Sequence, residues 1–369
     1  MAQRTMIDWD LAVSTASRLA GPGPVITRPE ADAVVAELRA GAERSSPLVR
    51  EFTGLVAEER TAPVLVVDRT GWIQANADAF SGVIGPLVEQ LRAKRGNPPG
   101  VVDAVGSKVT GLEVGGLLGF MSSKVLGQFD PFYTGPGRAA IGSGDPSANG
   151  SAPASAGRLL LVAPNIVHVE KELDVDPTDF RLWVCLHEET HRVQFTAVPW
   201  MRDHIHSEIE NIISTVDLDP GKFAELIGEG IGRIGEVLRG NDNTSLLDLF
   251  ATPEQKAIMD RVTGVMSLLE GHADVVMDGV GPSVIPSVDS IREKFNKRRK
   301  GGSYLDRVLR RLLGLDAKMA QYRDGAAFTR KVIDKVGMEG FNAVWAEPAN
   351  LPDKAEIGDP EAWVRRVHG

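Results

Sequence analysis

The stretch Asp176–Phe195 places two histidines and a glutamate at a spacing suited to metal chemistry. His187, Glu188 and His191 form an H-E-x-x-H pattern. On a helix, residues four apart lie one turn apart on the same face, so both imidazoles can bind one metal ion. Zinc favours such nitrogen ligands, and Glu188 would then face a water molecule held by that ion. The pattern predicts a zinc site on a helix that runs through the core.

The same stretch has the features of a helix that runs through a protein interior. Asp176 is a suitable N-cap, Pro177 suits the first helical position, and Asp179 adds negative charge to the first turn. Residues 182–186 are apolar on every side, which is typical of a buried helix. Cys185 in this run is expected to be a small core residue rather than a ligand. The alternative is a packed helix that carries two ordinary histidines.

A second group of carboxylates lies on a later helix. Thr252 and Gln255 can form a capping box around Pro253, and the helix is expected to end at residues 279–282. Glu270 and Asp274 are four residues apart, so they share one face of this helix. Two carboxylates on an otherwise apolar helix are costly to bury without a metal or a hydrogen-bond donor. Zinc for Glu270 and an imidazole N–H for Asp274 would satisfy both; the alternative is a solvated acidic face.

Several other side chains are candidates for contacting a substrate or stabilising an oxyanion. They are His204, His272, Tyr304 and Tyr322. If His204 or His272 were instead a fourth ligand, the site would be closed, as in structural zinc sites. His168 is expected to be a strand residue, with a place in the cleft as the alternative.

The composition limits the class of protein. A chain of 369 residues with 43% hydrophobic residues can bury a large core, in one domain or two. The single cysteine excludes an intramolecular disulfide and suits a reducing compartment. Asp8 and Asp10 interrupt any signal peptide, and no stretch approaches the roughly 20 apolar residues of a membrane span. We expect a soluble, cytoplasmic protein.

The charge argues against nucleic acid as a partner. The net charge is −9, whereas nucleic-acid binding depends on neutralising phosphates. One basic run, Arg292–Lys300, is interpreted as a solvated helix end.

The N-terminal part, residues 1–133, is expected to form a helical region packed on the core. Helices are predicted over 28–38, 47–56 and 72–95, and 61–68 is either a short strand or a turn. Four glycines lie near its end without the pattern of a phosphate-binding loop, so they are expected to let two helices approach closely. These glycines are Gly111, Gly115, Gly116 and Gly119.

The remaining segments lie before and after the predicted metal helix in the sequence. Residues 134–157, rich in Gly, Ser, Ala and Pro, are expected to form a flexible loop. Residues 158–163 predict a buried strand, and 165–170 a second strand or its continuation. A strand directly before the metal helix would let an extended peptide pair with its edge. Residues 281–369 are expected to form a C-terminal helical region.

With both motifs in view, the sequence resembles the gluzincin metallopeptidases, in which H-E-x-x-H on one helix is joined by the glutamate of E-x-x-x-D on a later helix. The resemblance implies that His187, His191 and Glu270 bind zinc and that Glu188 is the general base. It also implies that Asp274 supports a ligand histidine. The separation between the two motifs is longer here than in the best-known gluzincins.

Nearly the whole chain is also similar to a bacterial family of zinc-dependent metalloproteases, described as hydrolases associated with deazaflavin-coenzyme biosynthesis. The similarity rests on five segments, at 119–132, 165–173, 187–195, 268–278 and 321–328.

This family resemblance implies an α+β, mostly helical fold with a small sheet and a zincin-like core at 158–280. It implies one zinc ion per chain and hydrolysis of a peptide or other amide bond. The alternatives are a small-molecule amide hydrolase in coenzyme metabolism and a non-catalytic protein with a structural zinc. The physiological substrate and the oligomeric state stay open.

Overall fold

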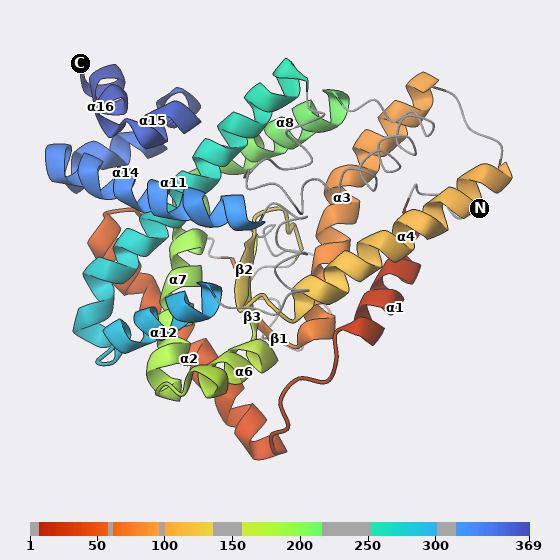
Figure 1. Cartoon of the computed structure of the whole chain (residues 1–369), viewed down its shortest axis with the longest axis horizontal. Coiled ribbons are helices and arrows are strands. Elements are labelled where there is room, and N and C mark those ends of the chain that lie inside the picture. Colours follow the sequence, from red (N-terminus) through yellow and green to blue (C-terminus); the bar gives the residue numbers. More distant parts are fainter. Residues whose placement is uncertain (1–6, 58–61, 96–99, 136–156, 216–251, 301–314) are drawn as a thin grey trace, which may run out of the picture. The chain divides into compact units, whose positions relative to one another are not determined.

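A three-stranded sheet lies beside the predicted metal helix. The computed structural model describes residues 7–57, 62–95, 100–135, 157–215, 252–300 and 315–369 (Figure 1). The strands are β1 (Val64–Val67), β2 (Gly127–Asp130) and β3 (Arg158–Val162), in the order β1-β3-β2. β1 runs parallel to β3, and β2 runs antiparallel to it. The central strand β3 is buried at all five residues, as predicted.

The chain divides into two compact units, 1–199 with 279–292, and 200–278 with 293–369. The first unit contains the sheet and the following helices in chain order: α1 (Trp9–Leu19), α2 (Arg28–Thr53), α3 (Arg69–Arg95), α4 (Gly100–Ser122), α6 (Ala163–Leu173) and α7 (Pro177–Ala197). The division of the chain into four consecutive segments, which was expected from the sequence, stays a prediction.

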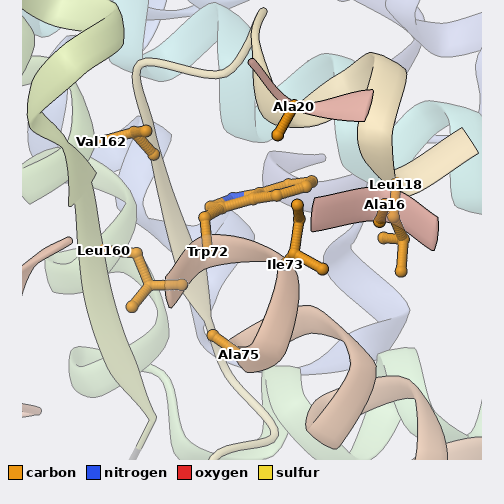
Figure 2. Packing of buried hydrophobic residues seen from close by; sticks show 8 residues of the cluster. All are labelled: Ala16, Ala20, Trp72, Ile73, Ala75, Leu118, Leu160 and Val162. Atoms are coloured by element: carbon orange, nitrogen blue, oxygen red, sulfur yellow. The ribbon is translucent and has the colours of Figure 1, made fainter. Parts of the chain in front are cut away.

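Helices cover both faces of the sheet in the first unit. Leu160 and Val162 of β3 face α1, α3 and α4, where they pack around Trp72 (Figure 2). The alternate residue Leu159 packs on the other face with Phe129 of β2 and Phe195 of α7. Successive side chains of a strand point to opposite faces, which explains how the four apolar residues of β3 pack against helices on both faces of the sheet.

Glycines bring α1 and α4 together, as the sequence analysis expected. A Cβ atom added at Gly111 would lie 2.7 Å from the Asp8 carbonyl oxygen, and one at Gly115 would lie 2.7 Å from that of Ala12. Gly119 similarly lies close against α1. A Cβ atom added at Gly116 would meet nothing within 4 Å, so this glycine takes no part in the close approach.

Two predicted elements differ from the structure. Residues 28–53 form one helix, α2, rather than two, and Pro47 lies inside it. This helix packs along α7, and that tertiary packing outweighs the local break that a proline favours. Residues 165–170 belong to helix α6 and not to a strand. The physical reason is that Pro164 lies in the first turn, where proline is favoured.

The second unit is helical throughout its described residues. Its elements are α8 (Pro199–Thr215), most of α11 (Pro253–Val284), the end of α12 (Val288–Lys300), α14 (Leu315–Phe341), α15 (Lys354–Gly358), α16 (Pro360–His368) and the short helices Asn342–Trp345 and Pro348–Asn350. The capping box of α11 is confirmed, because Thr252 and Gln255 exchange hydrogen bonds of 2.9 and 3.2 Å. Gly271 and Gly325 bring the backbones of α11 and α14 close together.

Candidate metal centre

Helix α7 carries the H-E-x-x-H residues and begins as predicted. The Asp176 carboxylate caps it by accepting a hydrogen bond of 2.9 Å from the Asp179 N–H. Residues 182–186 are buried, which confirms the predicted core helix. The Cys185 thiol is buried as well and lies 3.4 Å from the Leu38 carbonyl oxygen of α2, so it is a core residue.

Buried ion pairs fix the rotation of α7 about its axis. The Arg192 guanidinium donates two hydrogen bonds to the Glu189 carboxylate, at 2.6 and 2.8 Å, and a third to the Ala62 carbonyl oxygen. Both side chains are buried. Arg181 donates to Glu170 of α6 and to Glu37 of α2. The Arg192–Glu189 pair lies within α7, whereas the hydrogen bonds of Arg192 to Ala62 and of Arg181 to α6 and α2 attach the helix to its neighbours and so help to orient the face that carries the histidines.

His187 and His191 lie side by side on that face. Their ring centroids are 4.9 Å apart and their planes are nearly perpendicular. The Nδ1 atom of His191 lies 3.0 Å from the Gln194 side-chain oxygen. A neutral imidazole that donates from Nδ1 has Nε2 as its acceptor atom, so the contact with Gln194 is compatible with a metal ligand at Nε2. The sequence analysis missed Gln194, although its position one turn after His191 was a usable signal.

The third predicted ligand, Glu270, joins the two histidines in a group that could hold a metal ion. Ligand atoms of His187, His191 and Glu270 lie within 4.8 Å of one another. Zinc bonds of about 2.0–2.2 Å require ligand atoms roughly 3.5 Å apart, which small side-chain rotations would provide. Two imidazoles and one carboxylate are a donor set that catalytic zinc sites use, with one position left open. The residues therefore fit a zinc ion.

Glu188 lies against the edge strand β2. A Cβ atom added at Gly127 would lie 2.5 Å from Glu188 Cγ, 2.6 Å from its Cδ and 2.9 Å from Oε1. Only a residue without a side chain leaves room for the Glu188 side chain, and Glu188 as a whole is 8% exposed. The sequence analysis did not single out Gly127, because its role depends on the pairing of distant segments.

Strand β2 is held firmly in this position. The side chain of Gln128, on the opposite face from Gly127, accepts a hydrogen bond of 2.7 Å from the Trp72 indole. Asp130 forms a buried ion pair of 3.0 Å with Arg158, its cross-strand partner. Burial raises the pKa of Asp130, and the Arg158 charge opposes that rise. On the other face, Phe129 stacks on Phe195 of α7.

The strand expected to offer a free edge to a peptide was identified wrongly. β3, the strand that precedes the metal helix in sequence, has neighbours on both sides. Within the described sheet the outer strands are β1 and β2, and β2 is the one beside Glu188.

The other candidate residues are distributed over both units. Asp274 lies on α11 one turn after Glu270. His272 is fully buried and packs on Phe341 and Trp345, both at 5.4 Å between ring centroids, which favours a core role. His204 packs edge-on against Trp200 of the same helix, α8, and His168 is exposed on α6 near Glu172. Of the two tyrosines, Tyr322 belongs to α14 and Tyr304 lies outside the described residues.

Comparison with models of protein families identifies the family to which the chain belongs. The model of the zincin-like metallopeptidases matches residues 7–364. The chain belongs to this family. Membership supports a metallohydrolase with zinc as its cofactor, and it agrees with the mostly helical fold around a small sheet. No match was found among curated proteins.

A solved structure resembles this zincin-like protein over its whole length. It is described as a "putative hydrolase with a novel fold from Chloroflexus aurantiacus". The two chains are 30% identical, with a TM-score of 0.67, and the match covers 98% of this chain and 99% of the other. In the described part of the present chain, none of the helices has the length and apolar character needed to cross a membrane.

Proposed function

We propose that this zincin-like protein is a gluzincin-type peptidase that hydrolyses peptide bonds in extended segments. The observation that carries the proposal is the convergence of His187, His191 and Glu270, with the Glu188 carboxylate beside an edge strand. Asp274 is proposed to support a ligand histidine from α11, as Gln194 does from α7.

The protein side chains have separate roles in this proposal. His187, His191 and Glu270 hold the zinc ion, which when bound polarises a carbonyl group and lowers the pKa of water. The Glu188 carboxylate accepts the proton of the attacking water and delivers it to the nitrogen of the leaving amine. Its burial against β2 limits its rotation into solvent, which would help to hold the carboxylate in one orientation.

The edge strand favours a peptide over a compact amide as substrate. An extended peptide can add to the outer edge of β2 through main-chain hydrogen bonds, which places successive peptide groups along the strand. Because Gly127 lies against Glu188, a peptide bond paired near this residue would lie beside the general base. A small amide has no extended main chain that could form hydrogen bonds along the edge of β2. This difference distinguishes a peptide substrate from a small amide.

The non-catalytic alternative needs a closed site. Structural zinc sites normally have four protein ligands. In the described part of the chain, the metal-binding group contains three ligand residues, and His272 packs within an aromatic cluster. These observations favour an open fourth position, as a hydrolase requires.

The test is zinc content combined with peptide cleavage. We expect about one zinc per chain in the wild type and in Glu188→Gln, and a large loss in Glu270→Ala, because one of three ligands is removed. Glu254→Ala, an exposed change on the same helix, is the matched control and should retain zinc. Unstructured peptides should be cleaved by the wild type and not by Glu188→Gln.

Each combination of zinc content and hydrolytic activity distinguishes between the three candidate functions. A wild type that binds no zinc at neutral pH overturns the metallohydrolase. Zinc binding without cleavage of any peptide, together with hydrolysis of small amides that Glu188→Gln abolishes, would assign the small-molecule alternative. Zinc binding with neither activity would support the structural site.

A further inference from the structure

A cavity lies in the first unit. It is a crevice of about 400 Å³, formed by the loop after α1, the start of α2, the end of β1 and the start of α6. None of the H-E-x-x-H residues lines it. Its walls are mostly apolar and include Pro24, Ile26, Val34, Val66, Pro164 and Val167.

The position of the crevice is one where open sheets bind ligands. β1 and β3 are parallel neighbours, and the chain leaves them at Asp68 and Ala163, which both line the crevice. The carboxyl ends of parallel strands are a common place for ligands, because the loops there diverge and leave a cleft. The volume lies in the range of about 300–1,000 Å³ that is typical of small-molecule sites.

One positively charged side chain that lines this crevice is held in place by hydrogen bonds. Arg69, the first residue of α3, donates from Nε to the Asn165 side-chain oxygen at 2.7 Å and from Nη1 to the Ala20 carbonyl oxygen at 2.8 Å. Asn165 is buried and donates in turn to the carbonyl oxygens of Ser122 and Val125. The guanidinium is thus preorganised by a network of neutral acceptors.

The charge of Arg69 lacks an acidic partner among the described residues. All of its hydrogen bonds there go to amide or carbonyl oxygens, and Nη2 is not used in them. Burial lowers the pKa of Arg69, although an arginine stays protonated near neutral pH. Charge-assisted hydrogen bonds to a carboxylate are roughly twice as strong as neutral ones, so an anion at this point would be favoured.

Asp68 limits how much negative charge the site accepts. It lines the same mouth, and its Oδ1 accepts a hydrogen bond of 2.7 Å from the Gly71 N–H, which caps α3. A doubly charged phosphate would be repelled by this carboxylate, whereas a single carboxylate can bind Arg69 with less repulsion.

We propose that the crevice binds a small molecule with an apolar body and one carboxylate. The carboxylate accepts hydrogen bonds from Arg69, and the apolar body fills the space between α2, β1 and α6. The inference does not depend on hydrolysis, because it uses neither the zinc ligands nor Glu188.

The test uses octanoate as the probe and the zinc-loaded full-length protein, with isothermal titration calorimetry as the measurement. We expect saturable binding of octanoate and no comparable binding of octylammonium. Arg69→Gln should weaken octanoate binding at least about tenfold, because a charge-assisted pair is lost. Arg28→Gln removes an exposed arginine at the start of α2 and should leave the affinity unchanged.

A second variant keeps the proposal testable if Arg69→Gln does not fold. Ala31→Leu adds bulk to the wall of the crevice without touching Arg69, and it should also abolish binding. Absence of octanoate binding, or equal binding of octylammonium, would overturn the proposal. Binding that survives Ala31→Leu but disappears in Glu270→Ala would place the probe at the metal centre and overturn it equally.

Discussion

Gly127→Ala provides a sharp test of the proposed general base. The new Cβ atom would lie 2.5 Å from Glu188 Cγ and 2.6 Å from its Cδ. Unbonded carbon atoms approach to about 3.5–4.0 Å, so the Glu188 side chain must move by roughly 1 Å. A displacement of about 1 Å at a reacting group can lower the rate on the order of 100-fold. The φ angle of Gly127 is not positive, so alanine adds no backbone strain there.

We therefore expect the kcat of Gly127→Ala for an unstructured peptide to fall roughly 100-fold, within the range that removal of a general base produces. The zinc content should stay at the wild-type value, because the three atoms nearest to the new Cβ all belong to Glu188, which is not a proposed zinc ligand. Gly116→Ala is the matched control, since a Cβ there meets nothing within 4 Å. Steady-state kinetics, elemental analysis and thermal unfolding would be measured on all three proteins.

Three results would refute this reasoning. An unchanged kcat in Gly127→Ala would show that Glu188 need not occupy the observed position. Loss of zinc would mean that the substitution disturbs α7 as a whole, so that kinetics could not report on Glu188. A rise in KM alone would place Gly127 in substrate binding and not in positioning the base.

Other perturbations test the surroundings of the site. Gln194→Leu should weaken zinc binding about 10–100-fold, measured by competition with a chelator, while Gln194→Glu keeps an acceptor and should bind more tightly than Gln194→Leu. Gly115→Leu should destabilise the fold by about 1–3 kcal/mol in urea unfolding, because α1 leaves no space, whereas Gly116→Leu should cost much less. Arg192→Met leaves the Glu189 carboxylate buried and unpaired, so it should lower the free energy of unfolding by about 3–5 kcal/mol. The double variant with Glu189→Leu should recover much of that loss, and equal losses in both proteins would contradict the argument.

Local signals predicted the elements that have strong caps. Asp176 and Thr252 mark the starts of the two helices that carry the proposed ligands, and both caps form as expected. The glycines of α4 also predicted a close approach of two helices, although not that the partner would be α1. For the caps the cause lies within a few residues, so the sequence is sufficient.

Prediction failed where distant packing decides the outcome. The segment 165–170 contains β-branched apolar residues and was predicted as a strand or its continuation, but its buried residues belong to a helix. There, Glu170 pairs with Arg181 of α7, and Asn165 holds Arg69. A propensity argument cannot weigh such partners, which come from other elements. The same limit applies to Pro47, which the packing of α2 on α7 retains inside one helix.

The proposed site shows the same division between local and distant causes. His187, Glu188 and His191 can be found from spacing, because their relation is set by one helix. Gly127 acquires its role only after β2 pairs antiparallel with β3, which places residues far apart in the sequence side by side. The position of the proposed general base thus depends on a residue whose contribution is the absence of a side chain. For this reason the comparison of Gly127→Ala with Glu188→Gln is informative: if both lose turnover and keep zinc, the strand and the helix act on the same step.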